Sequence, residues 1–366
     1  MIFPKMKGAF MTMNRKVCSS CKPVHTAACL VMSILMLLIG SAVADVSIDA
    51  GHFPDANFRA YIASELDQDS NGTLSDEEIA NVDFISVSSL SVTSLQGIEL
   101  FPSLKTLFCD RNQLTALDVS KNPSLRSLYC NNNQLTALDL SSNTALMTLQ
   151  CDSNPLTVLD LTSQRELSSL SCRYMQLSSL DVSNAPQLKK LDCIGNQIAS
   201  LDLHNNQELT ELLCSENQLT VLDLSSNTKL TDLFCRHNQL TSLDLRNNTA
   251  LKQVDCKGSQ IAALDVSMLP KLEGLYCEEN RLSSLTFGEQ SLLSNVYCWG
   301  NQLDTIDVSH CSLLRMYINL WDRNNYTPGG ESAPLYSYWT DQPGDLLTDT
   351  FTTVIAGDLT SKPIGQ

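Results

Sequence analysis

The sequence is poor in the residues that catalysis and nucleic-acid binding commonly use. Only 5 of its 366 residues are histidine, and His204, His237 and His310 are scattered along the chain. Lysine and arginine number 24 against 40 acidic residues, a net charge of −16, which disfavours nucleic acid and anionic membranes as partners. No nucleophile elbow, phosphate-binding loop or cleft with paired carboxylates is recognisable. We therefore expect no enzyme activity.

Long apolar runs are also scarce, and the one that stands out is near the N-terminus. Residues 27–40 are largely apolar, follow a segment with five basic residues and no acidic one, and precede Ala42-Val43-Ala44. This order predicts a cleaved signal peptide over 1–44 and a secreted or cell-surface protein. The alternative is an uncleaved membrane anchor, although about 14 residues are short for a bilayer span. Cleavage leaves 19 basic and 40 acidic residues, a net charge of −21, and no membrane span.

What the sequence has in abundance is one 21-residue unit, which occurs ten times between 104 and 313. A clean copy begins at Leu125 and reads L-x-x-L-x-C-x-x-N-Q-L-T-x-L-D-L-S-x-N-x-x. Strict self-similarity at this period predicts a solenoid of stacked coils. Ten cysteines, each 21 residues after the last, mark the phase: Cys109, Cys130, Cys151, Cys172, Cys193, Cys214, Cys235, Cys256, Cys277 and Cys298.

The unit resembles the leucine-rich repeat, whose pattern is present in the first copy as Leu104, Leu107, Cys109, Asn112 and Leu114. It is similar in particular to bacterial surface proteins of the internalin type that contain a cysteine ladder, and to the 21-residue variant called IRREKO. The resemblance covers about two thirds of the chain that follows the predicted signal peptide. It implies a curved parallel β-solenoid used for binding, and it does not identify a ligand.

Alternation within each unit indicates a short strand. Leu107 and Cys109 alternate with Thr106, Phe108 and Asp110, so we expect leucine and cysteine to point into the core while their neighbours face outward on a concave side. The second half of the unit repeats the pattern without helical periodicity. We therefore expect a mainly β fold: a right-handed curved leucine-rich repeat solenoid with a parallel concave sheet, an extended convex side and a small α-helical N-terminal cap.

The chain divides into parts on these patterns. We expect a signal peptide over 1–44, a helical N-terminal cap over 45–81, the solenoid over 82–313 with a degenerate first coil at 82–103, and a C-terminal cap or the start of an accessory β module over 314–366. Caps are expected because the ends of a solenoid expose apolar core and unpaired strand edges. Leu314 and Tyr317 resemble the beginning of an eleventh coil, but Asn319 replaces the cysteine.

Two polar positions recur in the repeats. Asn112 and its equivalents follow the strand in eight of ten copies, and we expect each amide to bond backbone groups of its own and the adjacent coil. Met175 and Ser259 replace it in the other two, which predicts looser coils there. Asp118 begins a column of aspartates whose charges repel. We expect a hydroxyl or backbone amide to compensate each one; a row of cation sites is the alternative.

The ten phased cysteines are open to a structural and a functional interpretation. Equivalent Cβ atoms in an in-register stack lie about 4.8 Å apart, which is farther than a disulfide prefers. The inward position also belongs to leucine in ordinary repeats, and a buried free cysteine behaves as a small hydrophobic residue. We therefore expect ten packed thiols, and disulfides or metal ligation are the alternatives. Cys311 is off phase and is a candidate free thiol.

Residues 67–78 match the calcium loop of an EF-hand, D-x-[DN]-x-[DN]-G-x₅-E, at every position. The expected ligands are the side-chain oxygens of Asp67, Asp69 and Asn71, the carbonyl of Thr73, a water-bridged Ser75 and both carboxylate oxygens of Glu78. Because no second EF-hand is recognisable to pair with it, we expect one structural calcium site that pins the cap. The alternative is an acidic turn that only looks like such a loop.

The outward strand positions are informative because the fold does not dictate them. Aromatic residues and arginine at such positions form interface hot spots. They gather toward the C-terminal end of the solenoid, as Phe234, Arg236, Tyr276, Tyr297 and Trp299. We expect these residues to bind a protein; the alternative is that the rings merely stack along the sheet. A smaller group, Phe108 and Tyr129, lies near the start.

These features predict a secreted or surface-associated bacterial binding protein that holds a protein ligand on its concave face and acts as a monomer. The adhesin-like or internalin-like character is what the family resemblance implies, and the ligand would be a surface protein of a host or a bacterium. The alternative is a module that binds glycan or the cell envelope through the aromatic residues of 314–366. Neither hypothesis involves catalysis.

Overall fold

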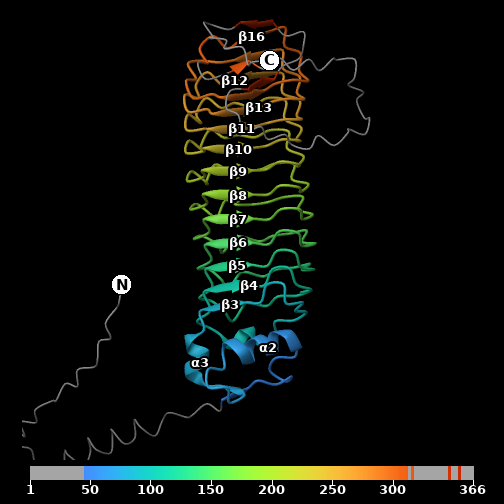
Figure 1. The fold of residues 1–366 in the computed structure, drawn as a ribbon, viewed down its shortest axis with the longest axis vertical. Helices are drawn as coiled ribbons and strands as arrows, with labels where there is room; N and C mark the ends of the chain where they lie inside the picture. The colour runs from blue at the N-terminus through green and yellow to red at the C-terminus, as the bar shows by residue number, and fades with distance from the viewer. Residues whose placement is uncertain (1–44, 312–314, 317–344, 348–352, 356–366) are drawn as a thin grey trace, which may run out of the picture. The chain divides into compact units, whose positions relative to one another are not determined.

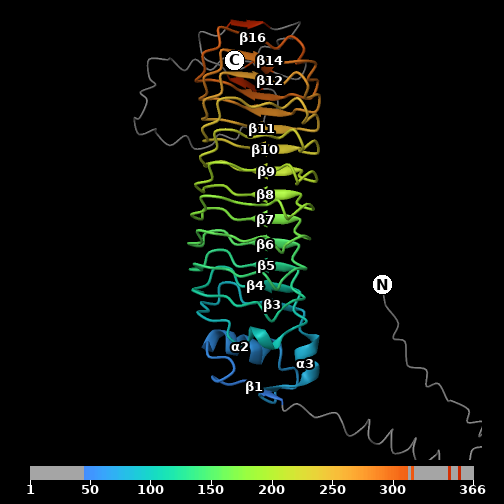
Figure 2. The same cartoon turned by 180° about the vertical axis from the view of Figure 1, so that it is seen from behind.

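The computed structural model describes residues 45–311, 315–316, 345–347 and 353–355. From Val46 onward the described chain consists mostly of stacked coils, with α-helices only at the end where the stack begins (Figures 1 and 2). The predicted signal peptide and most of the predicted C-terminal part, 314–366, lie outside the described residues. Within these ranges, every helix is too short or too polar to cross a membrane.

The cap combines two short helices with a strand pair. Asp55 begins the first helix by accepting hydrogen bonds from the backbone N–H groups of Asn57 and Phe58, both at 2.9 Å, as expected of an aspartate before a first helical turn. The elements that precede the first full repeat are β1 (Val46–Ser47), α2 (Ala56–Glu65), β2 (Thr73–Leu74), α3 (Asp76–Asn81) and, in the first coil, the 3₁₀ helix η1 (Ile98–Leu100).

Hydrogen bonds and apolar contacts join the cap to the first coil. The other carboxylate oxygen of Asp55 accepts the backbone N–H of Thr93 at 2.8 Å, and the hydroxyl of Tyr61 accepts the backbone N–H of Ser86 at 3.1 Å. Phe53 is fully buried in the same apolar core as the coils. The cap therefore covers the open end of the solenoid, as the sequence predicts for an element that shields apolar core.

One short strand per coil forms the main sheet, which is parallel and in register. In this sheet, the strands from β4 to β15 are three residues long, and each begins 21 residues after the preceding strand of the sheet. They are β3 (Phe84–Ser86), β4 (Thr106–Phe108), β5 (Ser127–Tyr129), β6 (Thr148–Gln150), β7 (Ser169–Ser171), β8 (Lys190–Asp192), β9 (Glu211–Leu213), β10 (Asp232–Phe234), β11 (Gln253–Asp255), β13 (Gly274–Tyr276) and β15 (Asn295–Tyr297). We call the outward surface of this sheet the strand face.

The opposite side of each coil is extended, as predicted. Within the described residues after η1 there is no helix. Towards the C-terminal end, short parallel strands form on this side as β12 (Ala263–Asp265), β14 (Ser284–Thr286), β16 (Thr305–Asp307) and β19 (Thr353–Ile355). The structure thus confirms a mainly β solenoid with a parallel sheet and an extended second side.

The chain order breaks at the C-terminal end of the main sheet. β18 (Asp345–Leu347) pairs directly with β15, and β17 (Arg315–Met316) pairs with the far side of β18. β18 and β19 therefore occupy the places next to β15 and β16. The expectation that an eleventh coil begins at Leu314 is wrong, because the strand at 315–316 is one place farther out.

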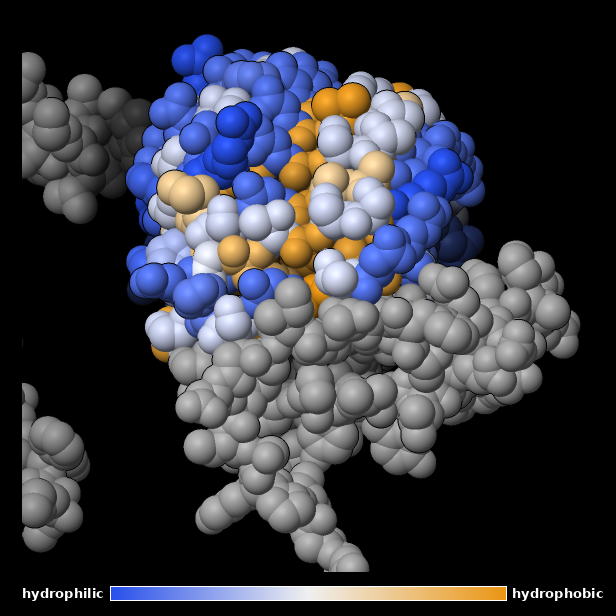
Figure 3. Space-filling model, turned by 90° about the horizontal axis from the view of Figure 1, so that it is seen from above, coloured by the Kyte–Doolittle hydropathy of each residue, from blue (hydrophilic) through white to orange (hydrophobic). Residues whose placement is uncertain are grey.

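The apolar core lies between the two sides of the coils. Leu107 and Cys109 have no exposed surface, and their equivalents in the other repeats are buried in the same way. Figure 3, which looks onto the end of the stack near β16, shows apolar residues as a band between hydrophilic margins. All eleven cysteines of the described residues are buried and none forms a disulfide, so the ten phased ones are packed thiols. Burial raises the pKa of the nine from Cys109 to Cys277, to about 12 for Cys130.

The asparagine that follows each strand joins adjacent coils, as predicted. The Asn133 amide nitrogen donates to the carbonyl oxygens of Cys109, at 2.9 Å, and Cys130, at 3.0 Å. Its side-chain oxygen accepts the backbone N–H of Leu114 at 3.0 Å. One buried side chain thus satisfies three backbone groups in two coils. Where Ser259 replaces asparagine, its buried hydroxyl oxygen has no hydrogen-bond partner.

A second asparagine position lies on the other side of the coils, ten residues after the first. Asn122 is fully buried, and its amide nitrogen donates to the carbonyl oxygens of Ile98 and Phe101, both at 2.9 Å. Its side-chain oxygen is buried without a partner, as are those of Asn143, Asn206, Asn227 and Asn248. The nested ten-plus-eleven pattern of the sequence therefore corresponds to two asparagine columns that differ in how completely they are bonded.

The aspartate column is compensated within each coil. In Asp118, one carboxylate oxygen accepts the backbone N–H of Ser120 at 2.9 Å, and all nine members bond the residue two positions later in the same way. Hydrogen bonds from the backbone N–H and the side chain of that residue lower the pKa of eight of the nine carboxyl groups. The structure supports the first interpretation, in which local donors offset the repulsion, over a row of cation sites.

Removing one asparagine of the first column should destabilise the solenoid. Asn217 bonds the carbonyl oxygens of Cys193 and Cys214 and the N–H of Ile198. Asn196 and Asn238 also donate to these two carbonyl oxygens, so Asn217→Ala leaves the buried N–H of Ile198 without a partner and removes one of the two asparagine bonds to each carbonyl. We expect the free energy of unfolding, measured in urea, to fall by roughly 2–4 kcal/mol. The control Asn205→Ala removes an exposed asparagine and should change it by less than about 0.5 kcal/mol. Equal effects of the two substitutions would contradict this role.

Candidate calcium loop and protein-binding surface

The predicted calcium loop connects α2 to α3 and brings its acidic side chains together. One oxygen from each of Asp67, Asp69 and Glu78 lies within 4.8 Å of the others. Asp67 and Glu78 are buried and Asp69 is exposed. Among the described residues, no ion pair involves any of these three carboxylates. Three converging negative charges without a cationic side chain are therefore present at the place where the sequence predicts a cation.

Hydrogen bonds within the loop fix its turn. The carboxylate of Asp67 accepts the backbone N–H of Gly72 at 2.9 Å, and the side-chain oxygen of Asn71 accepts the backbone N–H of Thr73 at 2.7 Å. Gly72 has a φ of +82°, in the left-handed region that glycine adopts without strain. It is the glycine of the calcium-loop pattern.

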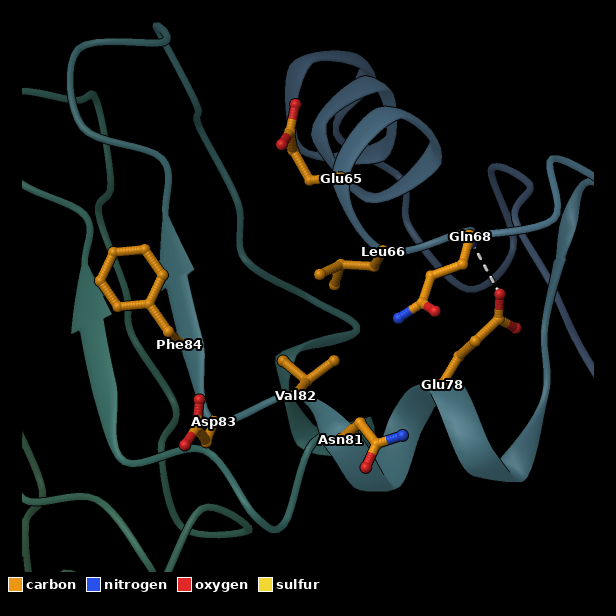
Figure 4. A pocket seen from close by; sticks show the side chains of 8 residues that line it. All are labelled: Glu65, Leu66, Gln68, Glu78, Asn81, Val82, Asp83 and Phe84. Atoms are coloured by element: carbon orange, nitrogen blue, oxygen red, sulfur yellow. Dashed lines mark hydrogen bonds between the residues drawn. The ribbon is translucent and has the colours of Figure 1, made fainter. Parts of the chain in front are cut away.

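Glu78 connects the two ends of the loop. One of its carboxylate oxygens accepts the backbone N–H of Gln68 at 2.7 Å (Figure 4), and the other accepts the backbone N–H of Ser75 at 2.8 Å. Ser75 and Glu78 also form a capping box at the start of α3. These bonds, those from Ser75 first, lower the pKa of Glu78. Ser75, expected as a water-bridged ligand, has its hydroxyl bonded to Glu78 at 2.8 Å.

The loop has a strand partner that the sequence analysis missed. β2 contains Thr73 and pairs antiparallel with β1, with Val46 opposite Leu74. An unpaired loop was the expectation, because no second EF-hand is recognisable in the sequence. Instead, residues directly after the predicted signal peptide support the loop strand. Leu74 is fully buried, as its inward position in the loop predicts.

The loop oxygens fit a calcium ion on chemical grounds. Calcium prefers six to eight oxygen ligands, with carboxylates prominent among them. The predicted ligands Asp67, Asp69, Asn71, Thr73 and Glu78 all belong to this one turn and supply only oxygen atoms. A pocket beside the loop is lined by the ends of α2 and α3 and by Asp83 and Phe84 at β3. Figure 4 shows Leu66 and Val82 directed toward one another in it.

The strand face arranges the predicted binding residues in two columns. The first column contains Phe234, Asp255, Tyr276 and Tyr297, which are aligned in successive strands. The rings of Tyr276 and Tyr297 are stacked, with centroids 5.1 Å apart and planes at 12°. Phe234 is separated from Tyr276 by Asp255. The structure therefore brings two of the predicted rings into contact and leaves Phe234 apart.

The second column, two residues further along each coil, contains Arg236, Lys257, Glu278 and Trp299. The Lys257 ammonium lies 4.9 Å from the centroid of the Trp299 ring. Arg236 has Glu216 as its ion-pair partner, at 3.6 Å. The predicted residue Trp299 thus contacts a lysine that the sequence analysis did not select, and Arg236 faces the other way along the column.

Three charged residues near the rings were not selected from the sequence. Asp255, Lys257 and Glu278 lie within the two outward columns, and their alternating charges in successive coils were the available signal. Burial raises the pKa of Asp255 and raises that of Glu278 to about 7. Lys257 lies 3.9 Å from Glu278 and 3.5 Å from Glu279, and its positive charge offsets part of this shift.

At the other end of the strand face, three rings are in contact. Phe108 and Tyr129 stack with centroids 4.2 Å apart and planes at 5°. Phe84, half-exposed on β3, lies 5.8 Å from Phe108. Phe108 and Tyr129 are the smaller aromatic group predicted from the sequence. Phe84 was not predicted, because the degenerate first coil obscures the repeat phase.

Comparison with known proteins identifies the fold. A 70-residue segment, 19% of the chain, is 36% identical to Internalin J of Listeria monocytogenes serotype 4b (strain F2365), and spans 8% of that protein. The functional domain of InlJ from Listeria monocytogenes, which includes a cysteine ladder, aligns with a TM-score of 0.59 and 29% identity over 76% of each chain. The solenoid is a leucine-rich repeat. No family model matches the chain.

A second solved structure agrees on this fold. The internalin InlF from Listeria monocytogenes strain 4b F2365 aligns with a TM-score of 0.60 and 20% identity, over 88% of this chain and 100% of that one. The InlJ domain and the present chain share a cysteine ladder as well as the fold. In its leucine-rich repeat fold the chain is therefore similar to these two internalins.

Calcium should bind once per chain and depend on Glu78. We expect isothermal titration calorimetry of the metal-free chain to show one calcium site, and Glu78→Gln to weaken it at least tenfold, because Glu78 supplies a carboxylate that the amide does not replace. The matched control Glu77→Gln alters the exposed neighbour on α3 and should bind like the parent. Because Glu78 also caps α3, its substitution can change the stability of the fold by itself. Calcium affinity is therefore the quantity to compare. No calcium uptake by the parent would contradict the site.

The free energy of unfolding should depend on pH because Glu278 ionises. Because burial raises the pKa of folded Glu278 to about 7, the folded state binds this proton more tightly than the unfolded state. Its stabilising contribution is therefore present below the ordinary glutamate pKa and is lost as pH rises through 7. Glu278 should therefore lower the unfolding free energy of the parent by roughly 2–3 kcal/mol between pH 4.5 and 8. We expect this decrease to be absent from the Glu278→Gln variant.

Urea unfolding at several pH values measures this difference. The control Glu208→Gln changes an exposed carboxylate that pairs with Lys229 at 2.6 Å, and its stability should follow the pH dependence of the parent in this range. Asp255 has a raised pKa of the same sign, so part of the slope should remain in Glu278→Gln. Identical slopes in the parent and Glu278→Gln would show that Glu278 titrates normally.

Proposed function

We propose that this chain is a secreted or surface-associated bacterial protein, without catalytic activity, whose strand face binds a protein ligand. The observation that carries the proposal is the cluster of Tyr276, Tyr297 and Trp299 at outward positions. The fold dictates leucine, cysteine and asparagine at the inward and turn positions, but it requires no ring on the strand face. Aromatic residues grouped at such a surface are the usual anchors of protein interfaces.

Ring geometry favours a protein over a glycan at this cluster. Tyr276 and Tyr297 lie face to face, so each covers one face of the other, and the Lys257 ammonium lies over the ring of Trp299. A sugar that stacks needs an open ring face, whereas the side chains of a protein can pack against ring edges and charged groups together. The glycan alternative rests on aromatic residues of 314–366 that lie outside the described residues.

Secretion is supported by the predicted signal peptide over 1–44, and the likeness to Internalin J is consistent with a bacterial protein. A host or bacterial surface protein is the proposed class of partner. We also propose that one calcium ion at Asp67, Asp69, Asn71, Thr73 and Glu78 stabilises the cap. A structural role fits because α3 leads within a few residues into β3, the first strand of the solenoid.

The ring cluster should be necessary for ligand binding. We expect the purified chain to bind a subset of proteins in panels of host-cell and bacterial surface proteins, and the triple variant Tyr276→Ala, Tyr297→Ala, Trp299→Ala to lose at least about 30-fold in affinity, as removal of hot-spot rings does. The control Phe108→Ala, Tyr129→Ala removes rings from the other end of the strand face and should retain binding. Biolayer interferometry provides the dissociation constants.

The same panels should include glycans. If both variants bind a protein as the parent does, the ligand-binding surface is elsewhere and the rings are structural. Binding to glycans alone would replace the proposal with the glycan-binding alternative. Circular dichroism of each variant establishes that it is folded before its affinity is compared.

A further inference from the structure

Beside the ring cluster, three carboxylates lie around Lys257, two of them near its ammonium group. Lys257 lies 3.9 Å from Glu278 and 3.5 Å from Glu279, and its own backbone N–H donates to Asp255 at 3.2 Å. Arg236, whose ion-pair partner is Glu216, also helps to lower the pKa of Asp255, which burial raises. The group of Asp255, Glu278 and Glu279 with Lys257 therefore has two more negative than positive charges when all are ionised.

One carboxylate oxygen of Glu278 lacks a hydrogen-bond donor. Its side chain is only 10% exposed, and its second carboxylate oxygen is buried with no partner. The Lys257 ammonium is beyond hydrogen-bond distance at 3.9 Å. A buried carboxylate oxygen that no donor satisfies is unfavourable by several kcal/mol unless a proton or cation joins it. This oxygen is the observation that distinguishes the group from an ordinary acidic surface.

The surroundings already accommodate an organic cation. The Lys257 ammonium lies over the Trp299 ring and near the carboxylates of Glu278 and Glu279, an arrangement that stabilises ammonium and guanidinium groups. A metal ion fits less well. Within the described residues, the only group of three acidic or other metal-binding side chains with ligand atoms inside 4.8 Å is Asp67, Asp69 and Glu78.

We propose that Glu278, with Asp255, Glu279 and Trp299, forms a cation site that receives one arginine or lysine side chain of the protein ligand. The incoming group donates hydrogen bonds to the unpartnered oxygen of Glu278. Lys257, which is 23% exposed on a flexible stem, moves from Glu278 toward Glu279 to admit it. The inference rests on the proposed function and adds a basic residue as a required feature of the ligand.

Protonation of Glu278 competes with the cation. Burial is the main reason that its pKa is raised to about 7, and Lys257, Asp255 and Glu279 are the charged groups that act on it. A bound guanidinium favours the ionised carboxylate and so lowers this pKa. Binding at the site should therefore strengthen as pH rises from 6 to 8.

A pair of small probes tests the site without knowledge of the ligand. N-acetyl-arginine N-methylamide presents one guanidinium, and N-acetyl-citrulline N-methylamide is its uncharged isostere. The carboxyl carbon of Glu278, observed by NMR in the ¹³C-glutamate-labelled full chain, should shift and saturate with the arginine probe at roughly millimolar concentration. Its apparent pKa should fall by at least about half a unit, and the citrulline probe should have neither effect.

Variants distinguish binding at the cation site from nonspecific attraction to the acidic surface. Glu278→Gln should weaken the arginine probe at least tenfold, as followed through the Trp299 indole signal, whereas Glu208→Gln removes the same charge from an exposed position and should leave the affinity unchanged. Equal response to both probes, or undiminished binding by Glu278→Gln, would overturn the cation site. A protein ligand that needs the rings but binds normally to Glu278→Gln would overturn it too, and would leave the proposed function standing.

Discussion

The solenoid depends on the need of each coil for hydrogen bonds that it cannot make within itself. A strand of three residues, followed by a tight turn, leaves backbone groups that only the neighbouring coil or a buried side chain can satisfy. Asn133 and its equivalents meet this need from the turn, bonding backbone groups of two coils. The 21-residue period, the inward leucine and cysteine and the straight register of the main sheet all follow from keeping these bonds in phase.

Because the inward and turn positions are committed to the fold, the chain can vary only where side chains face solvent. The strand face shows the result. Tyr276 and Tyr297 stack along one column, and beside them Lys257 links Trp299 to the carboxylates of the adjacent coil. A regular sheet thus presents an irregular surface, and the irregularity near β13 and β15 is where rings and unbalanced charge occur together.

The repetitive part could be predicted from the sequence, because the same residue pattern occurs in every repeat. The parallel sheet, the packed thiols and the asparagine bonds follow from period and alternation alone. Contacts that occur only once in the structure could not be predicted in this way. The pairing of β1 with β2 and the insertion of β18 beside β15 join segments far apart in the chain and carry no periodic signal. Lys257 and Glu278 were visible as column members, but their burial depends on how neighbouring side chains pack. Ser75 and Glu78 fit both a capping box and a calcium loop, and pattern alone does not separate the two.

In the main sheet from β4 to β13, each strand pairs only with the strands of the adjacent coils. Such an architecture transmits tension along its axis through one small interface at a time. Pulled at its ends, it would yield coil by coil, and each coil of 21 residues would release about 70 Å of extended chain in place of a rise of about 5 Å. A protein of this design at a cell surface would lengthen under load while the remaining coils, and the ligand that they hold, stay in place.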